Sequence, residues 1–159
     1  MKLYKNVQIF CNLPSEIDLY LVSTKIYHMK TAKNIYYLDD DFDDLGFFKE
    51  IAEELGHKVN VFSDGKKMLM MLEIQPVKPD VIFLDIHMPV LNGQEILEII
   101  KKTDYLKDIP VVMVSGAYPK KLLQYCADLG VKCMVKRHNF LEFKQNIAET
   151  LKDLRLVNN

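Results

Sequence analysis

The sequence predicts a single α/β domain whose parallel sheet is covered by helices on both faces. Five short apolar segments suited to strands alternate with amphipathic segments suited to helices, and the connections between them are short. The segments at 35–38, 81–84 and 111–114 lack the polar–apolar alternation of a strand with one exposed face, so we expect them to be buried on both faces. Regular alternation of strand and helix favours parallel strands joined by right-handed crossovers.

The composition is that of one folded domain in a reducing compartment. Of the 159 residues, 49% are hydrophobic and 27% are charged, which is typical of a globular chain long enough for a full core. The net charge of −1 gives no reason to expect nucleic acid or a membrane as the main partner. Cys11, Cys126 and Cys133 show no metal or redox spacing. Because the N-terminus lacks a signal-peptide pattern, we expect a cytoplasmic protein.

Residues 1–32 are expected to be an N-terminal extension of the domain. Residues 7–11 suit a short strand, and the apolar residues at 17–24 fit a helix or a strand equally well. The composition becomes polar near Met29. One hypothesis is that residues 1–28 are an appendage from upstream of a natural start at Met29. The alternative, an additional element packed on the domain, is equally well supported.

The domain itself is expected to cover residues 33–156 and to begin with a strand at 35–38. A helix is predicted from about Asp43, because acidic residues in the first turn suit the helix dipole. Asp43 or Asp44 is expected to cap this helix, and Gly56 suits the position just after its end.

The central strand of the prediction is Val81–Asp85, in which four apolar residues are followed by a carboxylate. A strand at 58–62 and a helix with apolar residues at 68–72 precede it. Pro89 prevents the strand from continuing, and the next helix is expected after Gly93.

Two further pairs of strand and helix complete the domain. They are a strand at 111–114, a helix with Pro119 at its first position, a strand at 131–135 and a helix at about 140–154. Three side chains of the helix that Pro119 opens are expected to face the core: Leu122, Leu123 and Cys126.

Carboxylate, hydroxyl and ammonium groups end four of the predicted strands. They are Asp39 and Asp40, then Asp85, then Ser115, then Lys136. Because parallel strands end at one edge of the sheet, where such folds bind ligands, we expect these groups to converge. Three converging carboxylates repel one another unless a cation lies among them, and oxygen ligands with room for water suit Mg²⁺. Lys136 and Ser115 would stabilise a phosphoryl group on the central carboxylate.

In the combination and order of these motifs, the chain resembles the receiver domain of two-component response regulators. The matching text is Leu38–Asp41, Leu84–Asp85, Met88–Pro89, Asn92–Gly93, Val114–Gly116 and Val135–Lys136. The form of the acidic cluster is similar to that of single-domain, CheY-like receivers of the phytochrome-associated type. The resemblance implies a flavodoxin-like, doubly wound sheet of five strands in the order 2-1-3-4-5.

The resemblance also implies a function. Asp85 would accept a phosphoryl group from a sensor histidine kinase or a histidine phosphotransfer protein, and Ser115 and Lys136 would contact that group. The implied Mg²⁺ ligands are Asp39, Asp40, Asp85 and the backbone carbonyl of His87. No enzyme activity is expected beyond self-catalysed phosphotransfer and dephosphorylation. The signal would leave through a downstream protein target or onward phosphotransfer, and a homodimer is compatible with the sequence.

Two residues depart from the family pattern. Arg137 stands where the family usually has a proline, often after a cis bond. A cis bond before another residue costs about 2.5–4 kcal/mol, so we expect a trans bond or a strained loop. Cys133 replaces the aromatic switch residue, so coupling between Ser115 and the last two helices is expected to be weaker or rearranged. A separate hypothesis is that His87 hinders or guides the water that attacks the phosphoryl group.

Two other functions are kept as alternatives. The first is a receiver-like interaction module that takes no phosphate, and it depends only on Cys133 and Arg137. The second is a phosphatase of the haloacid dehalogenase type, whose D-x-D opening fits Asp39–Asp41. That class needs a further acidic pair at a strand end after the lysine, which the sequence lacks, and it leaves Asp85 without a role.

Overall fold

The computed structural model describes residues 32–117 and 119–157, and all structural statements below concern these residues. The expectations for the first 31 residues, including the strand at 7–11, the start at Met29 and Cys11, lie outside the described part. None of the helices in the described ranges combines the length and the apolar character needed to cross a bilayer.

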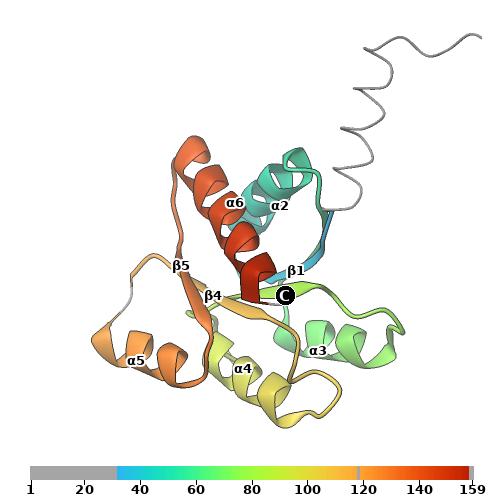
Figure 1. Ribbon diagram of the computed structural model, residues 1–159. Coiled ribbons are helices and arrows are strands. Elements are labelled where there is room, and N and C mark those ends of the chain that lie inside the picture. Colours follow the sequence, from blue (N-terminus) through green and yellow to red (C-terminus); the bar gives the residue numbers. More distant parts are fainter. Residues whose placement is uncertain (1–31, 118, 158–159) are drawn as a thin grey trace, which may run out of the picture. The chain divides into compact units, whose positions relative to one another are not determined.

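Five parallel strands form one sheet in the order β2-β1-β3-β4-β5, which confirms the order implied by the resemblance to receiver domains. The strands are β1 (Asn34–Leu38), β2 (Lys58–Phe62), β3 (Val81–Asp85), β4 (Val111–Ser115) and β5 (Lys132–Val135). The helices are α2 (Phe42–Glu54), α3 (Gly65–Ile74), α4 (Gly93–Lys102), α5 (Lys120–Asp128) and α6 (Phe140–Val157). Helices α2 and α6 lie on one face of the sheet, and α3, α4 and α5 lie on the other (Figure 1).

Successive side chains of the strands belong to two separate hydrophobic clusters, one on each face of the sheet. Ile35 and Tyr37 of β1 pack with α2 and α6, whereas Tyr36 and Leu38 pack with the helices of the opposite face. This follows from the alternation of side chains along a strand. All residues of β3 and of β4 are buried, as expected for strands covered on both faces.

The register of the strands brings their carboxyl ends to one edge of the sheet. Leu38 of β1 pairs with Leu84 of β3, so Asp39 and Asp85 follow at the same level. Ser115 at the end of β4 pairs with Val135 of β5, the residue before Lys136. Four neighbouring strands, β1, β3, β4 and β5, therefore end beside one another. At each of these ends lies a residue with a charged or hydroxyl side chain.

Several predicted helix details are wrong. Asp41, and neither Asp43 nor Asp44, caps α2: its backbone is extended and its carboxylate accepts hydrogen bonds from the amides of Asp43 and Asp44. Pro119 is the N-cap of α5 and not its first helical residue, because its ψ of 142° is extended.

A further correction concerns the core face of α5. Leu123 is 45% exposed, whereas Leu122 and Cys126 are buried as predicted. Residues four apart share a helix face, and Leu123 lies about 100° away from Leu122 around the axis. By contrast, the predicted helix end at Gly56 is confirmed by its positive φ of 86°, and Gly130 follows α5 with a positive φ of 64°.

Candidate functional site

Three carboxylates meet at the ends of β1 and β3. Asp39, Asp40 and Asp85 each offer an oxygen, and these oxygens all lie within 4.8 Å of one another. Asp39 and Asp85 are buried, while Asp40 is exposed to solvent. A compact set of hard oxygen donors with one open side fits Mg²⁺, which prefers carboxylate ligands and keeps several waters. The residues present are therefore compatible with the expected ion.

The ammonium group of Lys136 lies against this cluster. Its Nζ is 2.7 Å from Asp39 Oδ2 and 3.3 Å from Asp85 Oδ1. A third carboxylate, that of Asp44 in α2, lies 2.6 Å from the same atom. Burial by itself lowers the pKa of Lys136, but the hydrogen bonds and charges of its acidic partners outweigh burial and raise it. Lys136 therefore carries its charge at any physiological pH.

Asp85 is held from two sides. The backbone amide of His87 donates to Asp85 Oδ2 at 2.8 Å, and Lys136 contacts Oδ1. Burial and the nearby charge of Asp39 raise the pKa of Asp85, and this rise is opposed by Lys136 and by the amide of His87. The imidazole of His87 is exposed, and the role of its carbonyl as a metal ligand stays a prediction.

Ser115 is buried at the end of β4, where its hydroxyl is bonded within its own loop. The Oγ atom donates to the backbone carbonyl of Ala117 at 3.0 Å. The backbone amide of Lys136 donates to the carbonyl of Ser115 at 2.9 Å, which joins the ends of β4 and β5. The hydroxyl must therefore leave Ala117 before it can contact a group on Asp85.

Two residues that contact the predicted cluster were not expected from the sequence. Asp44 was assigned to capping, whereas its carboxylate binds Lys136. Tyr37 was assigned only to a strand, whereas its hydroxyl donates to Asp39 Oδ2. The second contact had a signal in the sequence, because side chains two residues apart on a strand lie on the same face. The pairing of Asp44 with Lys136 joins distant parts of the chain, and no local pattern indicates it.

The start of α4 packs directly on the backbone of Asp85. A Cβ atom added at Gly93 would overlap with the backbone carbonyl oxygen of Asp85. Asn92 and Glu95 form a capping box that fixes the first turn of this helix. The Asn92–Gly93 pair therefore allows a helix to begin immediately behind the central strand.

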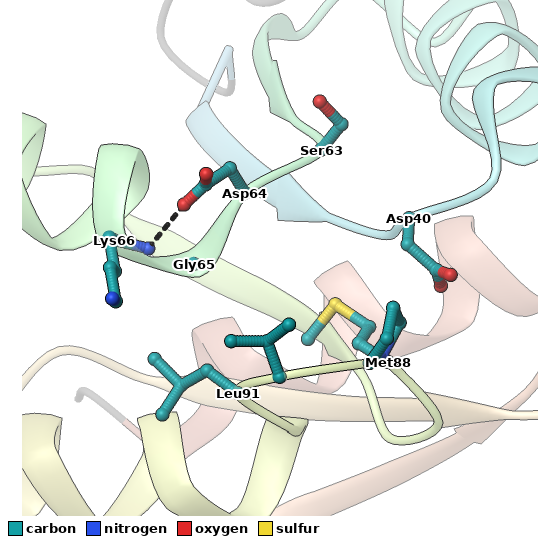
Figure 2. Close-up of a pocket in the computed structure, with 9 residues that line it drawn as sticks. Asp40, Ser63, Asp64, Gly65, Lys66, Met88 and Leu91 are labelled. Atoms are coloured by element: carbon teal, nitrogen blue, oxygen red, sulfur yellow. Dashed lines mark hydrogen bonds between the residues drawn. The ribbon is translucent and has the colours of Figure 1, made fainter.

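A cleft of about 230 Å³ lies beside Asp40. It is lined by Asp40, Ser63, Asp64, Gly65, Lys66, Met88, Pro89, Val90 and Leu91. Asp40 and Met88 lie toward one end of the cleft, and Lys66 lies toward the other (Figure 2). Val90 has a φ of 71°, a strained value for a β-branched residue, and its side chain is 93% exposed.

The two departures from the family pattern lie at β5. The bond between Lys136 and Arg137 is trans, as expected for a residue other than proline. Cys133 is partly buried and packs against the hydrophobic cluster that contains Cys126, although the two cysteines show no recognisable spacing in the sequence. Burial, together with this neighbour, raises the pKa of Cys133 to about 12.

Comparison with known proteins gives a consistent result. The family model of the response regulator receiver domain matches residues 35–148. The phosphorylated cyanobacterial phytochrome response regulator RcpA is 27% identical with a TM-score of 0.68, over 80% of this chain and 96% of that one. The Mn²⁺-bound form of response regulator Rcp1 is 26% identical with a TM-score of 0.62, over 71% and 87% of the two chains.

A larger protein also matches. The protein-glutamate methylesterase/protein-glutamine glutaminase of Bacillus licheniformis is 36% identical over 96 residues, which are 58% of this chain and 25% of that protein. The chain thus spans about a quarter of the length of this relative. The predicted resemblance is confirmed by the family model, which matches well over half of the chain. The chain belongs to the response regulator receiver domain family of two-component systems.

Proposed function

We propose that this domain is a phosphoacceptor in which Asp85 receives a phosphoryl group in the presence of Mg²⁺. The observation that carries the proposal is the position of Asp85 between two carboxylates and one ammonium group. Its carboxylate lies within 4.8 Å of oxygens of Asp39 and Asp40, and its Oδ1 lies 3.3 Å from the ammonium of Lys136. The phosphorylated RcpA and the Mn²⁺-bound Rcp1 support the proposal as relatives with the same fold.

Each residue has a distinct part in the proposed reaction. An oxygen of Asp85 attacks the phosphorus of a phosphohistidine, the P–N bond breaks, and the histidine nitrogen keeps the bonding electrons. Lys136 stabilises the negative charge on the transferred oxygens. Ser115 leaves Ala117 and donates its hydroxyl to the same group. This exchange of partners would report phosphorylation to the end of β4.

The Mg²⁺ ion would be held by four groups of this chain. They are the carboxylates of Asp39, Asp40 and Asp85 and the backbone carbonyl of His87. The ion would supply positive charge that offsets the repulsion between an incoming phosphoryl group and three carboxylates. Asp40, the exposed member of the set, would be the first ligand that an ion arriving from solvent meets.

The proposed partners follow from this chemistry. A sensor histidine kinase or a histidine phosphotransfer protein would supply the phosphoryl group. The signal would pass through contact with a downstream protein or through onward phosphotransfer, as a shift between two states of one fold. We assign these roles to residues 33–156, treat residues 1–32 as an extension, and propose no catalysis beyond self-catalysed transfer and hydrolysis.

The test is phosphorylation by acetyl phosphate with Mg²⁺, followed by intact mass. The wild type is expected to gain one phosphoryl group, and Asp85→Asn is expected to gain none. Asp104→Asn is a matched control, because Asp104 is an exposed acid of a surface ion pair, and it should be labelled like the wild type. A wild type that takes no label would instead favour the interaction module that works without phosphate.

The same experiment separates the phosphatase alternative. That mechanism requires Asp39 as the nucleophile, so label would be lost in Asp39→Asn and kept in Asp85→Asn. Asp85 as the nucleophile is supported by the number of donors on each carboxylate: Tyr37, Lys136 and the backbone amide of Asp41 contact Asp39, whereas Lys136 and the backbone amide of His87 contact Asp85.

A further inference from the structure

A tyrosine hydroxyl lies in the layer beneath the candidate site. Tyr37 is fully buried in β1, and its ring stacks on Phe48 with centroids 4.1 Å apart and planes at 25°. The ring belongs to the cluster between the sheet, α2 and α6. Its hydroxyl donates to Asp39 Oδ2. A side chain fixed by packing thus ends in a donor directed at one of the three clustered carboxylates.

Three donors from separate segments hold the Asp39 carboxylate. Oδ2 accepts from the hydroxyl of Tyr37 and lies 2.7 Å from the ammonium of Lys136. Oδ1 accepts from the backbone amide of Asp41 at 3.1 Å. A carboxylate has about four acceptor positions, so these donors leave one position, on Oδ1, for a cation or its water. The side chain is 1% exposed, so solvent does not orient it.

Tyr37 acts only as a donor. The ordinary pKa of a tyrosine hydroxyl is about 10, and the hydroxyl of Tyr37 donates a hydrogen bond to a carboxylate oxygen of Asp39. The hydroxyl therefore keeps its proton. Lys136 is shared with Asp44 and Asp85, whereas the hydroxyl of Tyr37 stands on a packed ring and donates to Oδ2 of Asp39.

We infer that Tyr37 is a positioning residue for Mg²⁺: its hydroxyl orients Asp39 so that Oδ1 stays available to the ion or to a water bound to it. This rests on the Mg²⁺ site of the proposed function and adds a residue that no ligand assignment includes. Groups that orient metal ligands through hydrogen bonds generally change metal affinity about 10–100-fold when they are removed. Tyr37 has the geometry of such a group.

Tyr37→Phe tests the inference, because it removes the hydroxyl and keeps the stacked ring. Tyr36→Phe is a matched control: Tyr36 is the preceding residue, is also buried, and packs on Phe62 on the opposite face of the sheet. Titration calorimetry with MgCl₂ is expected to show binding about tenfold weaker in Tyr37→Phe. Tyr36→Phe should match the wild type within about twofold.

A kinetic measurement shows whether the effect acts through the metal. With acetyl phosphate as donor, the Mg²⁺ concentration for half-maximal labelling of Tyr37→Phe should rise by the same factor as its Kd. Labelling at saturating Mg²⁺ should then equal that of the wild type. A purely structural defect would lower labelling at every Mg²⁺ concentration, and that result would overturn the inference.

The remaining outcomes separate the role of Tyr37 from the phosphoacceptor proposal. Equal Mg²⁺ affinity in wild type and Tyr37→Phe, or equal weakening in both tyrosine variants, contradicts a role of Tyr37 and leaves the phosphoacceptor intact. A wild type that binds no Mg²⁺ removes the proposed metal site and the inference with it. If Tyr37→Phe does not fold, wild type labelled with ¹³C at tyrosine Cζ is titrated with Mg²⁺. The Tyr37 resonance should shift more than that of Tyr36, and equal shifts would refute the positioning role.

Discussion

The two halves of the site differ in how closely they follow the family pattern. On the side of β1 and β3, three aspartates occupy the expected positions and converge within 4.8 Å. On the side of β4 and β5, Lys136 reaches the acids, but Cys133 and Arg137 replace the usual aromatic residue and proline. All residues proposed for the chemistry are thus present in the two halves, and both departures lie in or just after β5, on the side that would pass the signal onward.

The difference bears on the contacts that hold Lys136 in place. Lys136 is joined to the acidic half through Asp39, Asp85 and Asp44, and its position needs neither a proline after it nor a ring three residues before it. Cys133 instead packs beside Cys126, which lies in the hydrophobic cluster with α5. We therefore expect transfer to Asp85 to be independent of the residue at 133, and the response of α5 and α6 to depend on it.

The largest expected effect comes from Lys136→Met, which breaks the link between the halves. The variant leaves the carboxylates around Nζ without their common cation, and removal of one partner from a buried ion pair costs about 3 kcal/mol or more. We expect a loss of that order in the free energy of urea unfolding without Mg²⁺. Because Mg²⁺ can replace the missing positive charge, added Mg²⁺ should stabilise the variant more than the wild type.

Lys132→Met is the matched control for this prediction. Lys132 also belongs to β5, but its ion pair with Asp153 lies at the surface, where such pairs contribute about 1 kcal/mol or less. The decrease in the free energy of unfolding of Lys132→Met should be small and independent of Mg²⁺. Equal losses in the two variants would mean that the cluster does not depend on Lys136, and the distinction between the halves would then fail.

Gly93→Ala and Gly116→Ala probe the two halves by steric means. A methyl group at position 93 would overlap with the backbone carbonyl of Asp85, whereas one at position 116 would have no atom within 4 Å. Overpacking of this kind costs about 1–3 kcal/mol, so Gly93→Ala should be destabilised by about 2 kcal/mol and should be labelled more slowly at Asp85. Gly116→Ala should unfold at the wild-type urea concentration. A Gly93→Ala protein as stable as the wild type would show that α4 can move away from β3.

Much of the sheet could be predicted because its signal is local. A continuous apolar run placed β3 at its observed residues, and the carboxylate at its end identified the edge with the site. Helix starts were harder to predict. Three consecutive aspartates precede α2, and only the backbone conformation shows that Asp41 is the one that caps it.

The contacts that the sequence did not predict are those between distant segments. Asp44 and Lys136 meet because α2 begins and β5 ends near the same edge, and their charges alone do not identify the partner. The turn of the Ser115 hydroxyl toward Ala117 depends on a single rotamer. The contact of Tyr37 with Asp39 is different, because side chains two residues apart on a strand lie on the same face. This alternation predicts the contact when it is extended from β1 to Asp39, the residue that follows the strand.

Asp85→Asn gives the smallest stability change and tests the electrostatics of the acidic half. Burial and Asp39 raise the pKa of Asp85 above 3.8, so the folded state binds a proton that the unfolded state has released. The wild type therefore loses stability as pH rises through the raised pKa, and Asn removes this loss. Without Mg²⁺ at pH 7, the free energy of unfolding of the variant should exceed that of the wild type by about 1 kcal/mol, the usual size of the effect of a single substitution. Urea unfolding from pH 3.5 to pH 8 should show this gap shrinking toward the acid end. A gap that stays constant with pH, or a variant less stable at pH 7, would mean that Lys136 and the amide of His87 fully compensate the buried charge, and that the resting cluster is not poised to take up a cation.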